Sequence, residues 1–188
     1  MTYRTKARII LLGLLLSLCG LQGYGQDLKT YSVSFPEHSR AISPNRRYAL
    51  INVDSDTEPH HTVFLEDRRL KTRRMLFHYG RSIEVLWNPD SKSFALTNYE
   101  GSNISSCMVI YVDQKVPTID VWGELLEQVT TSERRIMTGN HHVYIKARTW
   151  DGAKTLKLKI SGYGGQSPHG FTRFYSYDIG GGVRRDKP

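Results

Sequence analysis

A stretch of this chain repeats itself after 45–46 residues. Residues 43–50 (SPNRRYAL) return as residues 88–96 (NPDSKSFAL), with one residue added in the turn. The echo continues from residues 62–67 (TVFLED) to residues 108–113 (MVIYVD). A period of this length, built from short apolar strands and Pro/Asp turns, is typical of four-stranded blades of the propeller type. The repeat predicts a scaffold and not an activity.

The first 25 residues have the pattern of a secretory signal peptide. Three basic residues precede an apolar run at 9–18, which is shorter than the roughly 20 residues that a membrane span needs. Gly23 and Gly25 occupy the two positions that a signal peptidase reads, which predicts cleavage before Gln26 and export to the periplasm or the medium. Cys19 leaves a lipoprotein anchor open as an alternative, although the large residue before it disfavours acylation.

The predicted mature chain has the size of one domain and a moderate positive charge. The whole chain has 188 residues and a net charge of +8, and cleavage after residue 25 removes three of these charges. The remainder is less basic than dedicated nucleic-acid-binding proteins, so no specific nucleic-acid partner is expected. Only Cys107 remains after cleavage, which excludes an intramolecular disulfide. The repeat aligns Cys107 with His61, where a half-buried thiol packs as a small apolar residue, and a reactive thiol is the alternative.

Apolar patterning with a period of two predicts antiparallel strands through most of the mature chain. One segment near 119–130 instead has the 3.6-residue period of a helix, with its apolar face formed by Trp122, Leu125, Leu126 and Val129. The strands divide a single domain, residues 26–180, into blade-like units at about 43–79, 83–116 and 140–179. The glycine-rich and then charged residues 181–188 predict a disordered tail. The expected fold is mostly β, with antiparallel blade-like sheets and one inserted helix.

Residues 43–113 resemble the WD40-like repeats of TolB-type propellers. The hallmark of these repeats is a strand ending in Trp, a Ser-Pro-Asp-Gly-Lys turn and a second apolar strand. Within residues 85–96 the matching positions are Trp87, Pro89, Asp90 and Lys92, while the usual Ser and Gly of the turn are replaced. A closed propeller needs at least about four blades, and this chain has room for three and a half. The resemblance therefore implies an incomplete or atypical propeller with open edges.

A dense basic run at residues 68–74 is the first candidate for binding. It contains five Lys or Arg side chains. On a strand, Arg69, Lys71 and Arg73 would share one face, which would suit an anionic glycan or a lipid headgroup. The alternative interpretation is a solvated outer strand whose charges discourage edge pairing.

The aromatic residues of the last predicted strand are the second candidate. Tyr163 and Phe174 lie close in sequence to the glycines at 162–165 and suit a sugar or a peptide, with a buried core face as the alternative. The strand directs aromatic side chains towards both faces, which is more than one core face needs. We therefore expect the flank that carries Phe174 to be buried against a second copy or a partner protein.

No catalytic, metal-binding or cofactor-binding motif stands out. A Gly-x-Ser-x-Gly motif is absent, and the glycines at 162–165 open no helix that would bind phosphate. The histidine pairs at 60–61 and 141–142 would offer one ligand per strand face, so no metal is expected. The sequence favours an exported, non-catalytic binding or assembly module. A secreted hydrolase acting on glycans or peptides is the alternative.

Overall fold

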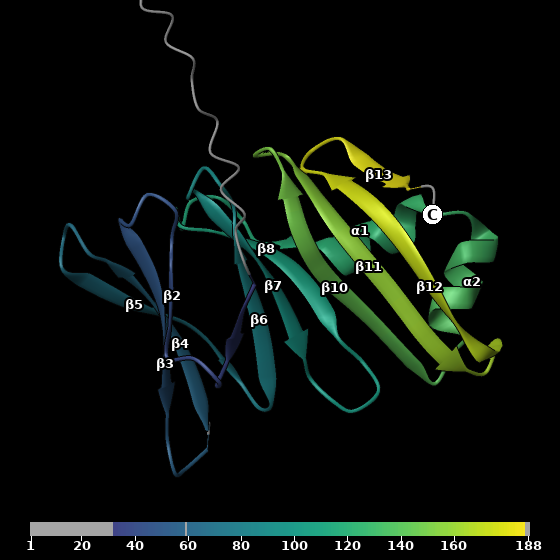
Figure 1. The fold of residues 1–188 in the computed structure, drawn as a ribbon, viewed down its shortest axis with the longest axis horizontal. Helices are drawn as coiled ribbons and strands as arrows, with labels where there is room; N and C mark the ends of the chain where they lie inside the picture. The colour runs from purple at the N-terminus through teal and green to yellow at the C-terminus, as the bar shows by residue number, and fades with distance from the viewer. Residues whose placement is uncertain (1–31, 59, 187–188) are drawn as a thin grey trace, which may run out of the picture.

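The computed structural model describes residues 32–58 and 60–186, which form a mostly β chain with three antiparallel sheets and two helices (Figure 1). The predicted signal peptide, residues 1–25, lies outside the described residues. The first sheet has the order β2 (Arg40–Ile42), β3 (Tyr48–Asp54), β4 (His61–Asp67), β5 (Thr72–Tyr79). The second has the order β1 (Val33–Phe35), β6 (Ser82–Trp87), β7 (Ser93–Tyr99), β8 (Ser106–Tyr111), β9 (Ile119–Asp120). The third has the order β10 (His142–Asp151), β11 (Thr155–Gly164), β12 (Ser167–Asp178), β13 (Gly182–Arg185).

The sequence repeat corresponds to equivalent strands of the first two sheets. β3 and β7 are each the second strand in a run of four consecutive antiparallel strands, β2–β5 in the first sheet and β6–β9 in the second. Each is entered by the same turn: the Ser43 N–H donates to the Tyr48 carbonyl (2.9 Å), and the Asn88 N–H donates to the Ser93 carbonyl (3.0 Å). Asn88 follows Ser43 by 45 residues, and Ser93 follows Tyr48 by the same number, so the two turns are equally long. The prediction that the second turn contains one additional residue is therefore wrong.

The repeat alignment of Cys107 also needs correction. In β7, Thr97 pairs with Cys107, and at the equivalent place in β3, Asn52 pairs with Val63. Cys107 is therefore the counterpart of Val63 and not of His61. Both Cys107 and Val63 are fully buried. A thiol takes the place of an apolar core residue here.

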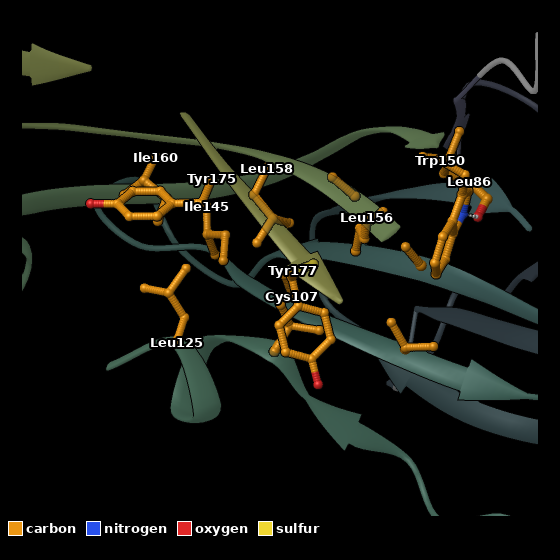
Figure 2. Close-up of a cluster of buried hydrophobic side chains, with 14 of the residues drawn as sticks. Leu86, Cys107, Leu125, Ile145, Trp150, Leu156, Leu158, Ile160, Tyr175 and Tyr177 are labelled. Atoms are coloured by element: carbon orange, nitrogen blue, oxygen red, sulfur yellow. Dashed lines mark hydrogen bonds between the residues drawn. The ribbon is translucent and has the colours of Figure 1, made fainter. Parts of the chain in front are cut away.

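Two apolar cores hold the three sheets in a row. The first core lies between the first and second sheets and includes Leu50, Val63, Ile83, Val85 and Phe94. The second lies between the second sheet, the helices and the third sheet, and includes Cys107, Leu125, Ile145, Leu158 and Tyr177 (Figure 2). Each of these cores buries one face of the second sheet. The described sheets form an open row, in which the first and third sheets each keep one outer face free of a neighbouring sheet (Figure 1).

The third sheet meets the second through the free edge of β10. Ser105 Oγ donates to the Ile145 carbonyl (2.8 Å) and accepts from the Ile145 N–H (2.8 Å). Thr97 Oγ1 accepts from the Ala147 N–H (3.1 Å). Hydroxyl groups of the second sheet thus occupy hydrogen-bonding positions that a neighbouring strand would otherwise fill.

Two helices follow β9 where the sequence predicted one. The predicted helix near 119–130 is α1 (Val121–Gln128), and the second is α2 (Thr131–Thr138). In α1 the Asp120 side chain caps the Gly123 N–H (3.1 Å), and a Cβ at Gly123 would lie only 2.6 Å from that carboxylate. In α2 only Met137 is fully buried, so the apolar period is too weak to reveal the helix. The capping box of Thr130 and Glu133 is the local signal that could have revealed it. None of the helices in the described part of the chain is long and apolar enough to cross a membrane.

The last described residues include a strand, β13, where the sequence predicted a disordered tail. β13 pairs with β12, with Val183 opposite Tyr177 and Arg185 opposite Tyr175. The Asp186 N–H donates to the Phe174 carbonyl (2.9 Å) and extends this pairing. The predicted tail at 181–188 is therefore wrong for residues 182–185. Two glycines at the turn allow the chain to reverse, because Gly180 and Gly182 have φ values of 73° and 120°.

β1 belongs to a different sheet from the strand that follows it. Val33 pairs with Val85, and Phe35 pairs with Ile83, although β2 enters the first sheet only a few residues later. Phe35 is fully buried in the first apolar core. The start of the described chain therefore completes the second sheet beside β6.

Candidate functional site

The basic run of the first sheet does not form a single strand face. Arg69 and Lys71 lie in the exposed turn 68–71, and Lys71 has a φ of 54°. Arg73 lies on β5, with its guanidinium carbon 3.9 Å from the centre of the Phe64 ring. The expectation that Arg69, Lys71 and Arg73 share one face is wrong, because the strand begins only at residue 72. The positions of these residues favour the alternative interpretation, in which the basic side chains are solvated at the outer edge of the sheet.

The two aromatic candidates lie on the outer face of the third sheet, four residues apart along the strand direction. Tyr163 pairs with His142 across β10 and β11, and their rings are stacked with centres 4.2 Å apart. Phe174 of β12 lies opposite Lys159, and the Arg148 guanidinium carbon is 5.1 Å from its ring centre. Tyr163 is 49% exposed, so its ring is open to a ligand.

Other aromatic residues of β12 point into the core. Tyr175 and Tyr177 are each 1% exposed. Tyr175 Oη donates to Glu133 Oε1 of α2 (2.9 Å), and Tyr177 Oη donates to Glu124 of α1. Burial, together with the hydrogen bond to Glu133, raises the pKa of Tyr175 to about 12. These two residues join the third sheet to the helices and are not available for binding.

Basic side chains share this outer face with Tyr163 and Phe174: Lys159 lines the same hollow as Tyr163, and Arg148 lies over Phe174. Lys146 forms an ion pair with Glu84 (2.7 Å). Burial alone would raise the pKa of Glu84, but hydrogen bonds from Lys146, Tyr99 and Ser32 outweigh it and hold that pKa below its usual range. Among the described residues, neither Arg148 nor Lys159 has an acidic group within 4 Å.

The positive charge of the described chain is concentrated in the third sheet. Residues 142–186 contain eight Lys and Arg against three Asp, with no Glu. Residues 32–141 contain thirteen Lys and Arg against fourteen Asp and Glu. The excess of positive charge therefore lies on one side of the molecule, where it favours anionic ligands.

An open hollow lies on the third sheet at the end where β11 turns into β12. Its volume is about 720 Å³, and its lining includes Tyr144, Lys159, Ser161, Tyr163, His169 and Thr172. Gly162 lies beside it, and an added Cβ there would approach the Phe171 ring to 2.8 Å. The hollow offers a ring face, one ammonium group and several hydroxyl groups to a bound molecule.

Sequence reasoning did not single out Arg148 or Lys159. Their signal is the alternation of basic residues along the hairpin, at 146 and 148 in β10 and at 157 and 159 in β11. This alternation puts all four on one face of the two strands, since Lys146 and Lys159 pair directly. An apolar residue separates the two basic residues of each strand, so they form no continuous charge run in the sequence.

Three arrangements common in catalytic sites are absent among the described residues: a nucleophile hydrogen-bonded to a His–Asp pair, a reactive thiol and a three-ligand metal cluster. His61 Nδ1 lies 2.8 Å from Asp54 Oδ1, but in the described part of the chain no serine, threonine or cysteine is hydrogen-bonded to this pair. Burial raises the pKa of the Cys107 thiol to about 12, which leaves it without thiolate character at neutral pH. No group of three His, Cys, Asp or Glu within residues 32–58 and 60–186 is placed to hold a metal ion.

Comparison with family models, with curated proteins and with solved structures finds no match for this chain. The outer face of the third sheet has to be interpreted from its own chemistry. That chemistry combines an exposed aromatic ring, cationic groups without acidic partners among the described residues, and an open hollow.

Proposed function

We propose that this chain is an exported, non-catalytic binding module that holds acidic glycans on the outer face of the third sheet. The observation that carries this proposal is the placement of Arg148 and Lys159 on the same face as the exposed ring of Tyr163. A flat face with this chemistry suits a ligand that is itself flat, hydroxylated and anionic.

Each part of the face matches a part of such a ligand. The C–H groups on one side of a sugar ring pack against an aromatic ring, and Tyr163 is held for this by its stacking on His142. The carboxylate or sulfate of an acidic sugar pairs with Lys159 or Arg148. Ser161 and Thr172 line the same hollow and supply hydroxyl groups for hydrogen bonds to the sugar.

A glycan fits this face better than a lipid surface. Binding to a membrane surface usually places large apolar side chains into the lipid. In residues 142–186 of the described chain, Tyr163 is the only exposed large apolar side chain. The face is thus equipped for polar recognition in solution.

We also infer that the three sheets are blades of an incomplete propeller. In support, the first and second sheets share the same meander and the same entry turn, and the three sheets follow one another in a row. In this arrangement an end blade leaves a whole sheet face free for ligands.

The test is a titration of the purified protein with oligogalacturonate and with its neutral methyl ester. We expect binding of the acidic form alone, weakened by salt because the charges are exposed. Tyr163→Ala and Lys159→Gln should each weaken binding by about 5- to 10-fold, which corresponds to about 1–1.4 kcal/mol. Tyr163→Phe should retain most of the affinity, since the ring is kept.

Arg69→Gln is the matched control, because it removes an exposed positive charge from the turn of the first sheet. It should leave the affinity unchanged. Equal binding of the acidic and neutral oligosaccharides would contradict the proposal, as would an effect of Arg69→Gln as large as that of Lys159→Gln. Release of new reducing ends would instead support the hydrolase alternative.

A further inference from the structure

The outer face of the first sheet, opposite to the face in the first apolar core, is apolar at its centre. The pairing of the strands puts the following side chains on this face: Ile42, Ile51, Val53, Phe64 and Met75. Ile42, Val53 and Met75 are 46%, 41% and 55% exposed. No sheet of the described chain covers them, because the second sheet packs on the opposite side.

Exposed apolar residues are concentrated on this side of the molecule. The described residues include seven exposed large apolar side chains, and four of them, Ile42, Val53, Leu70 and Met75, belong to the first sheet or its turn. Met75 also lines a separate groove of about 510 Å³ between β5 and β8, together with Val116, at the edge of this face. A contiguous apolar patch of this kind usually marks an interaction site.

The charges around the patch are of both signs. Arg40 forms an ion pair with Glu66 across this face (3.7 Å), and Arg73 lies over Phe64. The same face on a second copy therefore offers an anion, Glu66, to the cations of the first copy, and a cation, Arg40, to its anion. The outer face of the third sheet offers mainly cations, so a head-to-tail stack of the first sheet on the third sheet would bring like charges together.

The size of the face sets the strength of such a contact. Strands of 3, 7, 7 and 8 residues, spaced by about 4.8 Å and rising about 3.3 Å per residue, give a footprint of roughly 400 Å² per copy. Two such faces bury about 800 Å², below the roughly 1,000 Å² at which stable specific interfaces begin. The area therefore fits a weak, reversible dimer.

We propose that a second copy of this chain packs on the outer face of the first sheet, so that identical patches meet in a two-fold dimer. A two-fold contact closes after two copies and leaves no further apolar face at the junction. The dimer is a row of six sheets with the third sheet of each copy at an outer end. This proposal does not depend on what the third sheet binds.

The experiment is sedimentation velocity of the protein between 1 µM and 1 mM. We expect a shift from monomer to dimer within this range. Met75→Glu and Val53→Glu should each weaken the dimer at least 10-fold, because they place a charge in its apolar centre. Both side chains are substantially exposed, and an unchanged melting temperature at 1 µM would show that the fold is retained.

Tyr163→Glu is the matched control, since it adds the same charge to an exposed apolar residue of the third sheet. It should leave the dimer intact. A monomer at all concentrations would overturn the proposal. So would a dimer that resists Met75→Glu and is dispersed by Phe174→Glu, which would place the contact on the flank that the sequence favoured.

Discussion

Replacing Ser105 by alanine tests how the third sheet is attached to the second. Ser105 is 2% exposed, and its hydroxyl serves both the N–H and the carbonyl of Ile145 on the free edge of β10. Alanine removes both hydrogen bonds and leaves almost the same volume. The two backbone groups of Ile145 lie where water has little access, so they remain without partners.

The expected cost follows from these two groups. Leaving a buried polar group unsatisfied costs about 1–3 kcal/mol, so two groups should cost about 3 kcal/mol in total. For a domain of this size, that corresponds to a fall in Tm of roughly 6–12 °C. Thr97→Val removes the acceptor of one N–H, that of Ala147, and should cost about half as much.

Urea unfolding at pH 7 measures this cost directly. The midpoint should fall for Ser105→Ala without a change in the m-value, since the surface exposed on unfolding is the same. Ser106→Ala is the control, because its neighbouring hydroxyl donates only to Glu100 at the surface, and it should cost less than about 1 kcal/mol. A free energy of unfolding for Ser105→Ala within about 0.5 kcal/mol of the unchanged protein would refute this account of the sheet junction.

Three further predictions concern the pH dependence, the thiol and the N-terminus. The folded-state pKa of Glu84 is lowered, so its contribution to stability is present above the pKa of the unfolded chain and is lost as the pH falls through the folded value. Glu84→Gln should therefore destabilise the protein by about 1–3 kcal/mol at pH 7 and reduce the loss of stability on acidification, measured by urea unfolding from pH 7 to pH 3. Glu127→Gln, which changes an exposed carboxylate of α1, should do neither. Cys107 should react with a disulfide reagent only at the rate of unfolding, because it is buried and its pKa is about 12; fast labelling of the folded protein would contradict this. N-terminal sequencing after expression in a Gram-negative host should find Gln26 first, and an uncleaved chain in the cytoplasm would contradict export.

The parts of the fold that the sequence predicted are those with strong local signals. The Pro-containing turns at 43–47 and 88–92 immediately precede β3 and β7, and the repeat correctly predicted that these two segments are equivalent. The following strands were misaligned, because the register of β8 on β7 differs by one residue from that of β4 on β3. Local patterning does not specify such an offset, and only the pairing of Thr97 with Cys107 reveals it.

The missed elements share a physical reason. α2 and β13 are both short and carry few buried apolar residues, so tertiary partners stabilise them more than their own sequence does. The candidate site also depends on tertiary structure that local sequence does not specify. Tyr163 and Phe174 were visible as aromatic residues, whereas Arg148 and Lys159 join them only through the register of three strands.

The pairing of β1 with β6 has a consequence for the order in which the chain assembles. A ribosome delivers residues 33–35 long before residues 83–85, so β1 has no partner strand while the whole first sheet is being made. The edge of β6 in turn stays open until β1 docks, and an open edge invites pairing with another chain. β1 can therefore pair only after the first sheet and β6 have been made, and a separate peptide carrying its sequence should compete for the same edge during refolding.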